Sequence, residues 1–355
     1  MNGPFLSYSP LYRDTLLAIR AGAGIEWETL RHSSLLLSGG TGQIGSHLID
    51  ALMYMNREAE LDCRIKVLTR SPEKARERFS HWIPDGKLSF IRFDFSQNDV
   101  VPETADAEYV IHLASNTHPL AYAARPIETV MVNVSGTAAM LDTAVRSRAK
   151  TFLLASSNEI YGENRGDTEL FTEDYAGYID CNTLRAGYPE SKRCAEALCR
   201  AYGQEKGLVT VVARLTRTYG PTLLRSDTKA MSQFLFNGAC GKDIVLKSDG
   251  TQCYSYTYVT DAVSGLLTVL TRGRCGEAYN IAEESFDMPL RDMAGIVARE
   301  SGVQVKYDVP SKLEASGYSV VTKARLSGEK VRALGWKAFY PCAEGIRTTL
   351  KIWSR

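Results

Sequence analysis

The sequence has no long apolar segment and no excess of charge of either sign. Its 355 residues include 42 Lys and Arg against 41 Asp and Glu, which gives a net charge of +1. No apolar run approaches the roughly 20 residues of a membrane-spanning helix, and residues 1–10 lack the basic start and apolar core of a secretory leader. We therefore expect a cytoplasmic protein without a membrane or nucleic-acid partner, because polyanion binding usually needs a basic excess.

The cysteines and histidines form no recognisable metal-binding pattern. No two of the eight cysteines make a C-x-x-C pair, and the five histidines show no ligand spacing such as H-E-x-x-H. Scattered cysteines are typical of a reduced intracellular chain rather than of a disulfide framework. The sequence therefore predicts no metal site.

Short aliphatic runs alternate with helical stretches over most of the chain. The runs lie at residues 35–37, 65–68, 88–91, 109–113, 152–154 and 209–212, and the helical stretches lie near 43–56, 72–80, 126–147 and 189–206. Such strands, without polar alternation of their own, indicate a parallel sheet that is covered on both faces. We predict an α/β fold: a doubly wound Rossmann-type parallel sheet with a smaller C-terminal α/β substrate lobe.

Three regions are predicted along the chain. Residues 1–31 have helical apolar spacing and should pack on the body, since Trp27 and Leu30 need burial. Residues 32–220 form the predicted NAD(P)-binding domain, with a return segment near 253–282, and residues 221–355 form mainly the substrate-binding lobe. In the lobe we expect helices near 228–239, 260–271, 289–301 and 323–334, and strands near 244–247 and 254–258.

A glycine-rich turn follows the first predicted strand and opens a helix. Gly39 allows the tight turn, Gly42 lets a pyrophosphate approach the backbone, and Gly45 lets the helix press on the strand. The diphosphate would accept hydrogen bonds from the free N–H groups of the helix N-terminus. The turn favours dinucleotide binding over a plain strand-to-helix connection, and its candidate ligands are Gly39, Thr41, Gly42, Gln43, Ile44 and Gly45.

The second predicted strand ends in Arg70 and carries no acidic residue there. An acid at this point would accept from the ribose 2′-hydroxyl of NAD, whereas an arginine suits the 2′-phosphate of NADP. Arg70 therefore favours NADP(H) as the cofactor. The alternative interpretation is that Arg70 is a solvated residue at the start of a helix.

Tyr188 and Lys192 stand four residues apart on one face at the start of a predicted helix. A phenol with a pKa of about 10 is a poor base at neutral pH, and an adjacent cation favours the phenolate. We expect Lys192 to supply that cation. Ser157 follows the strand at 152–154, so we assign Tyr188 as a base and Ser157 as its hydrogen-bond partner.

Further motifs lie in the same order as in a known family. They are Asp94-Phe95, His112-Leu113-Ala114-Ser115, Asn133 to Thr137, Ser156 to Gly162, Arg214, Tyr219-Gly220-Pro221, Tyr258-Val259-Thr260-Asp261 and Leu334-Gly335-Trp336. With the glycine turn and Tyr188, they resemble the extended short-chain dehydrogenase/reductase superfamily, in particular its NAD-dependent epimerase/dehydratase branch acting on nucleotide sugars. The resemblance runs from about Leu35 to Arg347.

The resemblance implies a nicotinamide that removes hydride from the sugar C4 and later returns it, through a transient 4-keto sugar. It makes Tyr188 the C4-hydroxyl base and Ser157 its partner, and it places Lys192 on the nicotinamide ribose. Relatives of this kind are usually homodimers. The other cofactor contacts that we expect are Asp94 and Phe95 beside the adenine, and Leu113, Ala114, Ser115 and Asn133.

A 4-ketone acidifies the neighbouring C–H and makes a C5 carboxylate a good leaving group. Epimerisation, dehydration and decarboxylation therefore all become reachable. Asn158 stands where 4,6-dehydratases usually have an acid, and Glu159 is either a C5 base or a carboxylate that caps the following turn. The segment from Arg185 to Arg193 looks more like UDP-glucuronate decarboxylases than like other branches.

Two departures from the family concern the substrate. The segment 252–255 lacks the arginine that usually contacts the nucleotide diphosphate, and Arg217 stands in place of an asparagine. Either Arg217 or Arg225 makes the phosphate contact from another direction, or the substrate is not a conventional UDP- or dTDP-sugar. The candidate substrate-binding residues are Ser157, Asn158, Glu159, Arg217, Arg225 and Tyr254.

Other interpretations remain beside this one. The same scaffold serves net NADP-dependent reductases or dehydrogenases of small carbonyl compounds, and it also serves cofactor-binding sensors that have lost catalysis.

Asn133 is expected to steady the active-site strand through local backbone hydrogen bonds. His112 is either a satisfied near-core imidazole or a cofactor contact, and Trp336 and Phe339 are expected to anchor the second lobe.

Overall fold

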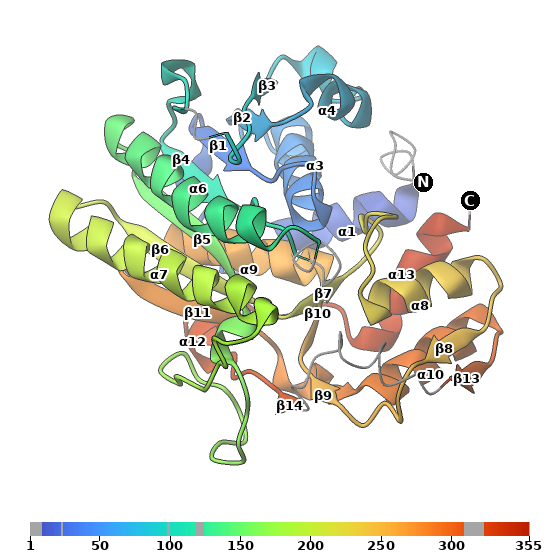
Figure 1. Cartoon of the computed structure of the whole chain (residues 1–355). Coiled ribbons are helices and arrows are strands. Elements are labelled where there is room, and N and C mark those ends of the chain that lie inside the picture. Colours follow the sequence, from blue (N-terminus) through green and yellow to red (C-terminus); the bar gives the residue numbers. More distant parts are fainter. Residues whose placement is uncertain (1–8, 23, 98–99, 118–123, 309–322, 355) are drawn as a thin grey trace.

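The computed structural model describes residues 9–22, 24–97, 100–117, 124–308 and 323–354. Its centre is a seven-stranded parallel sheet with the order β11-β6-β5-β4-β1-β2-β3 (Figure 1). The strand order reverses between β1 and β4, so a ligand crevice is expected at their carboxyl ends. The strands are β1 (Ser34–Ser38), β2 (Arg64–Thr69), β3 (Leu88–Arg92), β4 (Tyr109–His112), β5 (Thr151–Ser157), β6 (Thr210–Leu215) and β11 (Glu277–Ile281).

Both faces of this sheet are buried, because successive strand residues point to opposite sides. Leu35 and Leu37 of β1 belong to one apolar core, and Leu36 belongs to a second one. The first core is shared with α3 (Gln43–Glu58) and α9 (Val259–Arg272), and the second with α6 (Pro126–Arg146) and α7 (Gly187–Lys206). Two-sided burial explains the aliphatic runs without polar alternation and confirms the doubly wound fold.

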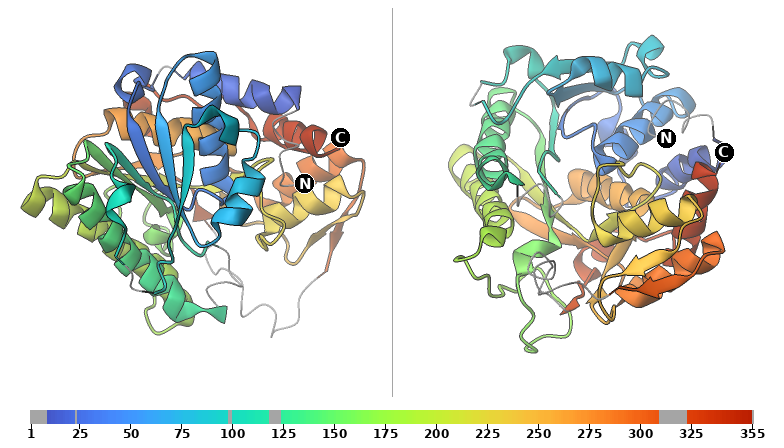
Figure 2. Two further views of the ribbon diagram at one scale, coloured as in Figure 1. Left: turned by 90° about the horizontal axis from the view of Figure 1, so that it is seen from above. Right: turned by 45° about the vertical axis from the view of Figure 1, so that its right-hand side comes forward.

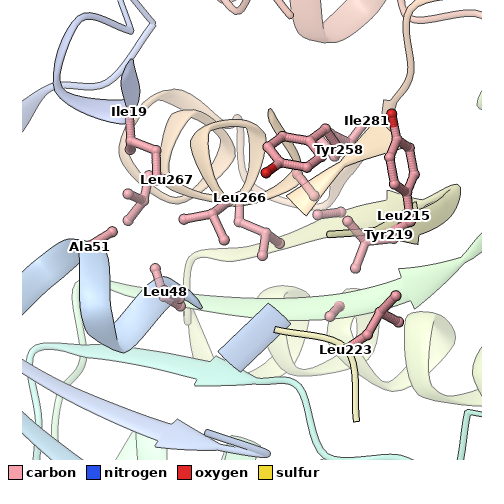
Figure 3. Packing of buried hydrophobic residues seen from close by; sticks show 14 of the residues in the cluster. Ile19, Leu48, Ala51, Leu215, Tyr219, Leu223, Tyr258, Leu266, Leu267 and Ile281 are labelled. Carbon is pink, nitrogen blue, oxygen red and sulfur yellow. The ribbon is translucent and has the colours of Figure 1, made fainter. Parts of the chain in front are cut away.

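The N-terminal residues pack on the first core. Helix α1 (Pro10–Arg20) places Ile19 beside Leu267 of α9, with Leu48 of α3 nearby (Figure 3). The Tyr12 hydroxyl donates a 2.6 Å hydrogen bond to Asp50 in α3. The short helix α2 (Trp27–Leu30) follows, and its Leu30 is fully buried.

A smaller lobe follows the sixth strand of the sheet. Its helices α8, α10 and α13 pack on one another beside the sheet, as the right-hand view of Figure 2 shows. Its strands pair as β10–β7, β12–β9–β14 and β13–β8. The bounds of these elements are β7 (Arg217–Tyr219), α8 (Ala230–Ala239), β8 (Ile244–Leu246), β9 (Cys253–Tyr254), β10 (Tyr256–Tyr258), β12 (Met288–Pro289), α10 (Leu290–Ser301), β13 (Val305–Tyr307), β14 (Lys323–Ala324) and α13 (Cys342–Trp353).

Short helices complete the described part of the chain. They connect strands or precede longer helices. They are α4 (Pro72–Arg78), η2 (Ile83–Asp85), η3 (Glu103–Ala105), η4 (Asn158–Tyr161), η5 (Leu184–Ala186), η6 (Glu284–Phe286) and α12 (Glu329–Ala333).

Three details of the lobe differ from the sequence prediction. The helix expected at 323–334 is wrong, because residues 323–324 pair as β14 with β9 and only α12 is helical. The strand expected at 254–258 is broken at Ser255, since its two halves join different sheets. Helix α13 was not expected. Its buried residues, among them Ile346, Leu350 and Trp353, recur at helical spacing and dock on α8 and α10, so the sequence did carry a signal for this helix.

Within the described residues, no helix is both long enough and apolar enough to cross a membrane.

Candidate functional site

The glycine turn joins the carboxyl end of β1 to the N-terminus of α3. Gly39 has a φ of +70°, and a Cβ atom there would lie 2.7 Å from the Ala114 nitrogen. A Cβ atom on Gly45 would lie 2.3 Å from the Gly39 oxygen, whereas one on Gly42 would meet that oxygen only at 3.3 Å. The turn is thus packed tightly against β4 and more open at Gly42.

The start of α3 leaves polar groups for a ligand. Its N-cap, Gly42, has no side chain to accept from the first N–H groups. The buried Gln43 Nε2 finds no hydrogen-bond partner within the described ranges, and Thr41 and Ile44 are only partly buried. These groups fit the diphosphate of a dinucleotide, which favours helix N-termini.

The end of β4 is tied to β1 through Ser38. The Ser38 hydroxyl accepts from the backbone nitrogens of Leu113 and Ala114 at 3.2 and 3.3 Å, and it lies 2.6 Å from His112 Nδ1. His112 is buried, and burial together with the positive charge of Lys192 lowers its pKa to about 3. His112 is therefore a neutral imidazole with one nitrogen hydrogen-bonded inside the fold.

Asn133 of α6 connects β4 with α7. Ser115 donates to Asn133 Oδ1 at 2.7 Å, and Asn133 Nδ2 donates to Ser191 at 2.9 Å. The Ser191 hydroxyl donates in turn to the Tyr188 carbonyl at 2.8 Å. The expectation of local backbone hydrogen bonds was wrong for the Asn133 side chain, because it bonds to the side chains of Ser115 after β4 and Ser191 in α7.

Tyr188 lies in the first turn of α7 and is buried. Burial raises the pKa of Tyr188 to about 12, and the charge of Glu159 raises it as well, against the hydrogen bonds with Ser157 and Ser115, which lower it. Ser157 Oγ also accepts from the Glu159 nitrogen at 3.2 Å. The structure thus brings the phenol together with Ser157, its predicted partner, and with Ser115, which was predicted only as a cofactor contact.

Lys192 lies one turn after Tyr188 and is also buried. Its ammonium group donates to the Ala155 carbonyl on β5 at 2.9 Å. The role of Lys192 as the cation that favours the Tyr188 phenolate stays a prediction.

Burial lowers the pKa of Lys192 to about 8, with Glu196 acting in the opposite direction. Between about pH 8 and the ordinary lysine pKa near 10.4, the unfolded chain holds the extra proton, so this lysine makes stability rise with pH. We expect Lys192→Met to be more stable than the parent protein at pH 7, by up to about 3 kcal/mol, with a difference that shrinks toward pH 10.

Urea unfolding of the cofactor-free protein at both pH values measures this difference. The exposed Lys206, at the end of the same helix, provides the control. Lys206→Met should change the unfolding free energy by less than about 0.5 kcal/mol at either pH. A stability difference for Lys192→Met that does not vary with pH would contradict the lowered pKa of Lys192.

Glu159 forms ion pairs with two arginines. Its Oε2 accepts from Arg185 at 3.1 Å, and its Oε1 lies 3.9 Å from Arg217. The guanidinium of Arg217 in turn stacks on the Tyr254 ring, 3.6 Å from the ring centre. The cap of the following turn is Ser157 rather than the Glu159 carboxylate. Arg185 was not among the predicted site residues, and only its position three residues before Tyr188 pointed to it.

The two remaining candidate substrate-binding residues, Asn158 and Arg225, differ in burial. Asn158 is buried in η4, next to Glu159. Arg225 is exposed in the loop after β7.

The predicted adenine contacts lie after β3. Asp94 Oδ1 accepts from the nitrogen and the hydroxyl of Ser96, at 3.0 and 2.8 Å. Phe95 packs edge-on against Phe93 and lies 5.4 Å from the His112 ring. Arg70 is 63% exposed and reaches Glu128 of α6 at 3.6 Å. An arginine so placed is already engaged by a carboxylate, which weakens the argument for NADP.

The chain matches the model of the NAD dependent epimerase/dehydratase family over residues 35–282. It belongs to this family. It is 29% identical to UDP-glucuronic acid decarboxylase 1 of Xenopus tropicalis over 321 residues, which cover 89% of this chain and 71% of that protein. It is 33% identical to UDP-glucuronic acid decarboxylase 6 of Arabidopsis thaliana over 242 residues, which cover 68% and 67% of the two chains.

Solved structures of this family have the same fold. A dTDP-glucose 4,6-dehydratase from Streptomyces venezuelae with bound NAD superposes with a TM-score of 0.75 at 24% identity, over 90% of this chain and 96% of that one. A UDP-glucuronic acid 4-epimerase from Bacillus cereus with UDP-glucuronic acid and NAD gives 0.75 at 20% identity, over 90% and 98%. The family therefore comprises NAD-dependent enzymes that modify nucleotide sugars.

Proposed function

We propose that this protein decarboxylates a nucleotide-linked glucuronic acid through a transient 4-keto sugar, with NAD as its bound cofactor. The observation that carries the proposal is the meeting of Tyr188, Ser157 and Ser115 at the carboxyl edge of the sheet, beside the glycine turn. The uronic acid is suggested by the decarboxylases among the relatives.

In this proposal the residues of the chain move the protons. NAD, when bound, supplies reversible hydride removal at the sugar C4. Tyr188 takes the proton from the C4 hydroxyl, and Ser157 holds the same oxygen by a hydrogen bond. Once C4 is a ketone, the bond between C5 and its carboxylate breaks, and the electron pair moves into an enolate whose oxygen Tyr188 and Ser157 stabilise. Carbon dioxide leaves, C5 takes up a proton, and reduction at C4 completes the cycle.

The surroundings of Glu159 favour decarboxylation over dehydration. Dehydration across C5 and C6 needs a base to remove the C5 proton, but the Glu159 carboxylate is engaged by Arg185 and lies close to Arg217. Asn158 cannot donate a proton as a carboxylic acid would. Decarboxylation removes no proton from C5, so it does not require a free carboxylate base.

The cofactor proposal follows the family rather than Arg70. The family is NAD dependent, and Arg70 pairs with Glu128. We expect NAD to bind more tightly than NADP when both are titrated by calorimetry. Tighter binding of NADP would support the contact between Arg70 and the 2′-phosphate of NADP that the sequence predicted.

Product analysis tests the proposed reaction. We expect mass spectrometry of incubations with UDP-glucuronic acid and NAD to show loss of carbon dioxide from the sugar without net consumption of NAD. Water loss from dTDP-glucose instead would identify a dehydratase. Stoichiometric consumption of NADPH with a small carbonyl compound would identify a reductase, and cofactor binding without any turnover would favour the sensor.

We further propose that two copies pair through α6 and α7. These helices pack side by side on one face of the sheet (Figure 1), and α6 exposes Ile127 and Met131. Native mass spectrometry of the whole chain should show a dimer, and a monomer at micromolar concentration would contradict this pairing.

A further inference from the structure

Arg217 carries a positive charge next to the reacting groups of the candidate site. Strand β7 pairs with β10 in parallel, so Arg217 stands opposite Tyr256. The backbone nitrogen of Arg217 donates to the Ser255 carbonyl at 3.3 Å. From this strand the side chain lies across the ring of Tyr254 in β9. A planar guanidinium on an aromatic face is held in orientation while its edges stay available for hydrogen bonds.

The charges around Arg217 do not cancel. Glu159 supplies one negative charge, and Arg185 and Arg217 supply two positive charges. Arg185 donates directly to Glu159, whereas the 3.9 Å between Arg217 and Glu159 exceeds hydrogen-bond distance and leaves room for another oxygen. The Arg217 side chain is 23% exposed, so a ligand can reach it. A partly buried cluster with surplus positive charge is suited to an anion.

The cluster also lies beside the reaction centre. Glu159 follows Ser157 by two residues, and its charge acts on Tyr188. An anion bound at Arg217 would therefore belong to the molecule whose hydroxyl meets Tyr188. Tyr254 contributes the ring on which the Arg217 guanidinium rests.

We propose that Arg217, held by Tyr254, binds an anionic oxygen of the nucleotide sugar, either a phosphate oxygen or the C5 carboxylate. This inference rests on the proposed function and names the residue that recognises its substrate. Tyr254 acts as a positioning residue, since it contacts the guanidinium by its ring face.

Calorimetric titration of the NAD-loaded full chain with UDP, dTDP, UDP-glucose and UDP-glucuronic acid tests the inference. Arg217→Gln should weaken binding roughly tenfold or more, the usual cost of a charge-assisted hydrogen bond. Weaker binding of all four ligands would identify the diphosphate as the bound anion. Weaker binding of UDP-glucuronic acid alone would identify the carboxylate.

Two further variants separate recognition from packing. Tyr254→Phe keeps the ring but removes the hydroxyl that hydrogen-bonds Arg217, so it should weaken these ligands less than Tyr254→Leu. Tyr254→Leu removes the stacking surface as well and should weaken the same ligands as Arg217→Gln. The exposed Arg76 on α4 supplies a matched loss of charge, and Arg76→Gln should change nothing. NAD affinity should be equal in all variants, which shows that the cofactor domain is intact.

Two results would overturn the inference alone. One is equal affinity of the parent protein and Arg217→Gln for every ligand, and the other is a loss in Arg225→Gln in place of Arg217→Gln. If the parent protein bound none of the four ligands, the proposed function itself would fail, and the inference would fail with it.

Discussion

Tyr188→Phe should lower kcat at least about a hundredfold, because a positioned acid or base contributes on this scale. The change removes the phenol oxygen and leaves the ring, so the buried packing at the start of α7 is kept. Ser157 and Ser115 lose a shared partner, but both residues are only partly buried. We expect NAD affinity to change little, and steady-state turnover of UDP-glucuronic acid measures the effect.

Tyr202 provides the matched control for this prediction. It lies near the other end of α7, and its hydroxyl donates to Asp142 at 2.7 Å. Tyr202→Phe removes a phenol hydroxyl from the same helix, away from Ser157, and should leave kcat within about twofold of the parent value. If Tyr188→Phe turned over as fast as Tyr202→Phe, the Tyr188 phenol would have no part in the reaction.

Gly45→Ala should weaken NAD binding by up to about a hundredfold and lower the unfolding free energy by about 1–3 kcal/mol. The added Cβ atom would stand 2.3 Å from the Gly39 oxygen and 2.7 Å from the Gly40 Cα atom. Both are backbone atoms, so the turn must move, and with it the N–H groups proposed to hold the diphosphate. Calorimetric NAD titration and urea unfolding measure the two effects.

A second glycine separates the local clash from the general effect of alanine. Gly295 lies in α10, and a Cβ atom there would meet nothing within 4 Å. Gly295→Ala should leave NAD affinity unchanged and raise the unfolding free energy by about 0.5–1 kcal/mol, since alanine favours helix. NAD binding by Gly45→Ala as tight as that of the parent protein would show that this turn does not hold the cofactor.

The main sheet was predictable because its information is local. A strand buried on both faces must be aliphatic throughout, as in Leu35, Leu36 and Leu37, and a helix that covers it must repeat its apolar residues every three to four positions. The glycine turn was equally readable, since tight backbone contact at Gly39 and Gly45 excludes other side chains. The lobe was predicted less well, because β9, β12 and β14 are two residues each and exist only through pairing.

The candidate site, like the fold, was predicted from the sequence only in part. The sequence by itself determined the family, the order of the motifs and the choice of Tyr188, Ser157 and Lys192, because each motif is a short run with its own backbone requirement. Only the tertiary structure decided that Lys192 donates to Ala155, that Arg70 reaches Glu128, and that Arg217 rests on Tyr254. These contacts join elements far apart in the chain. Their partners depend on how the packed helices and strands orient long side chains, which no local pattern encodes.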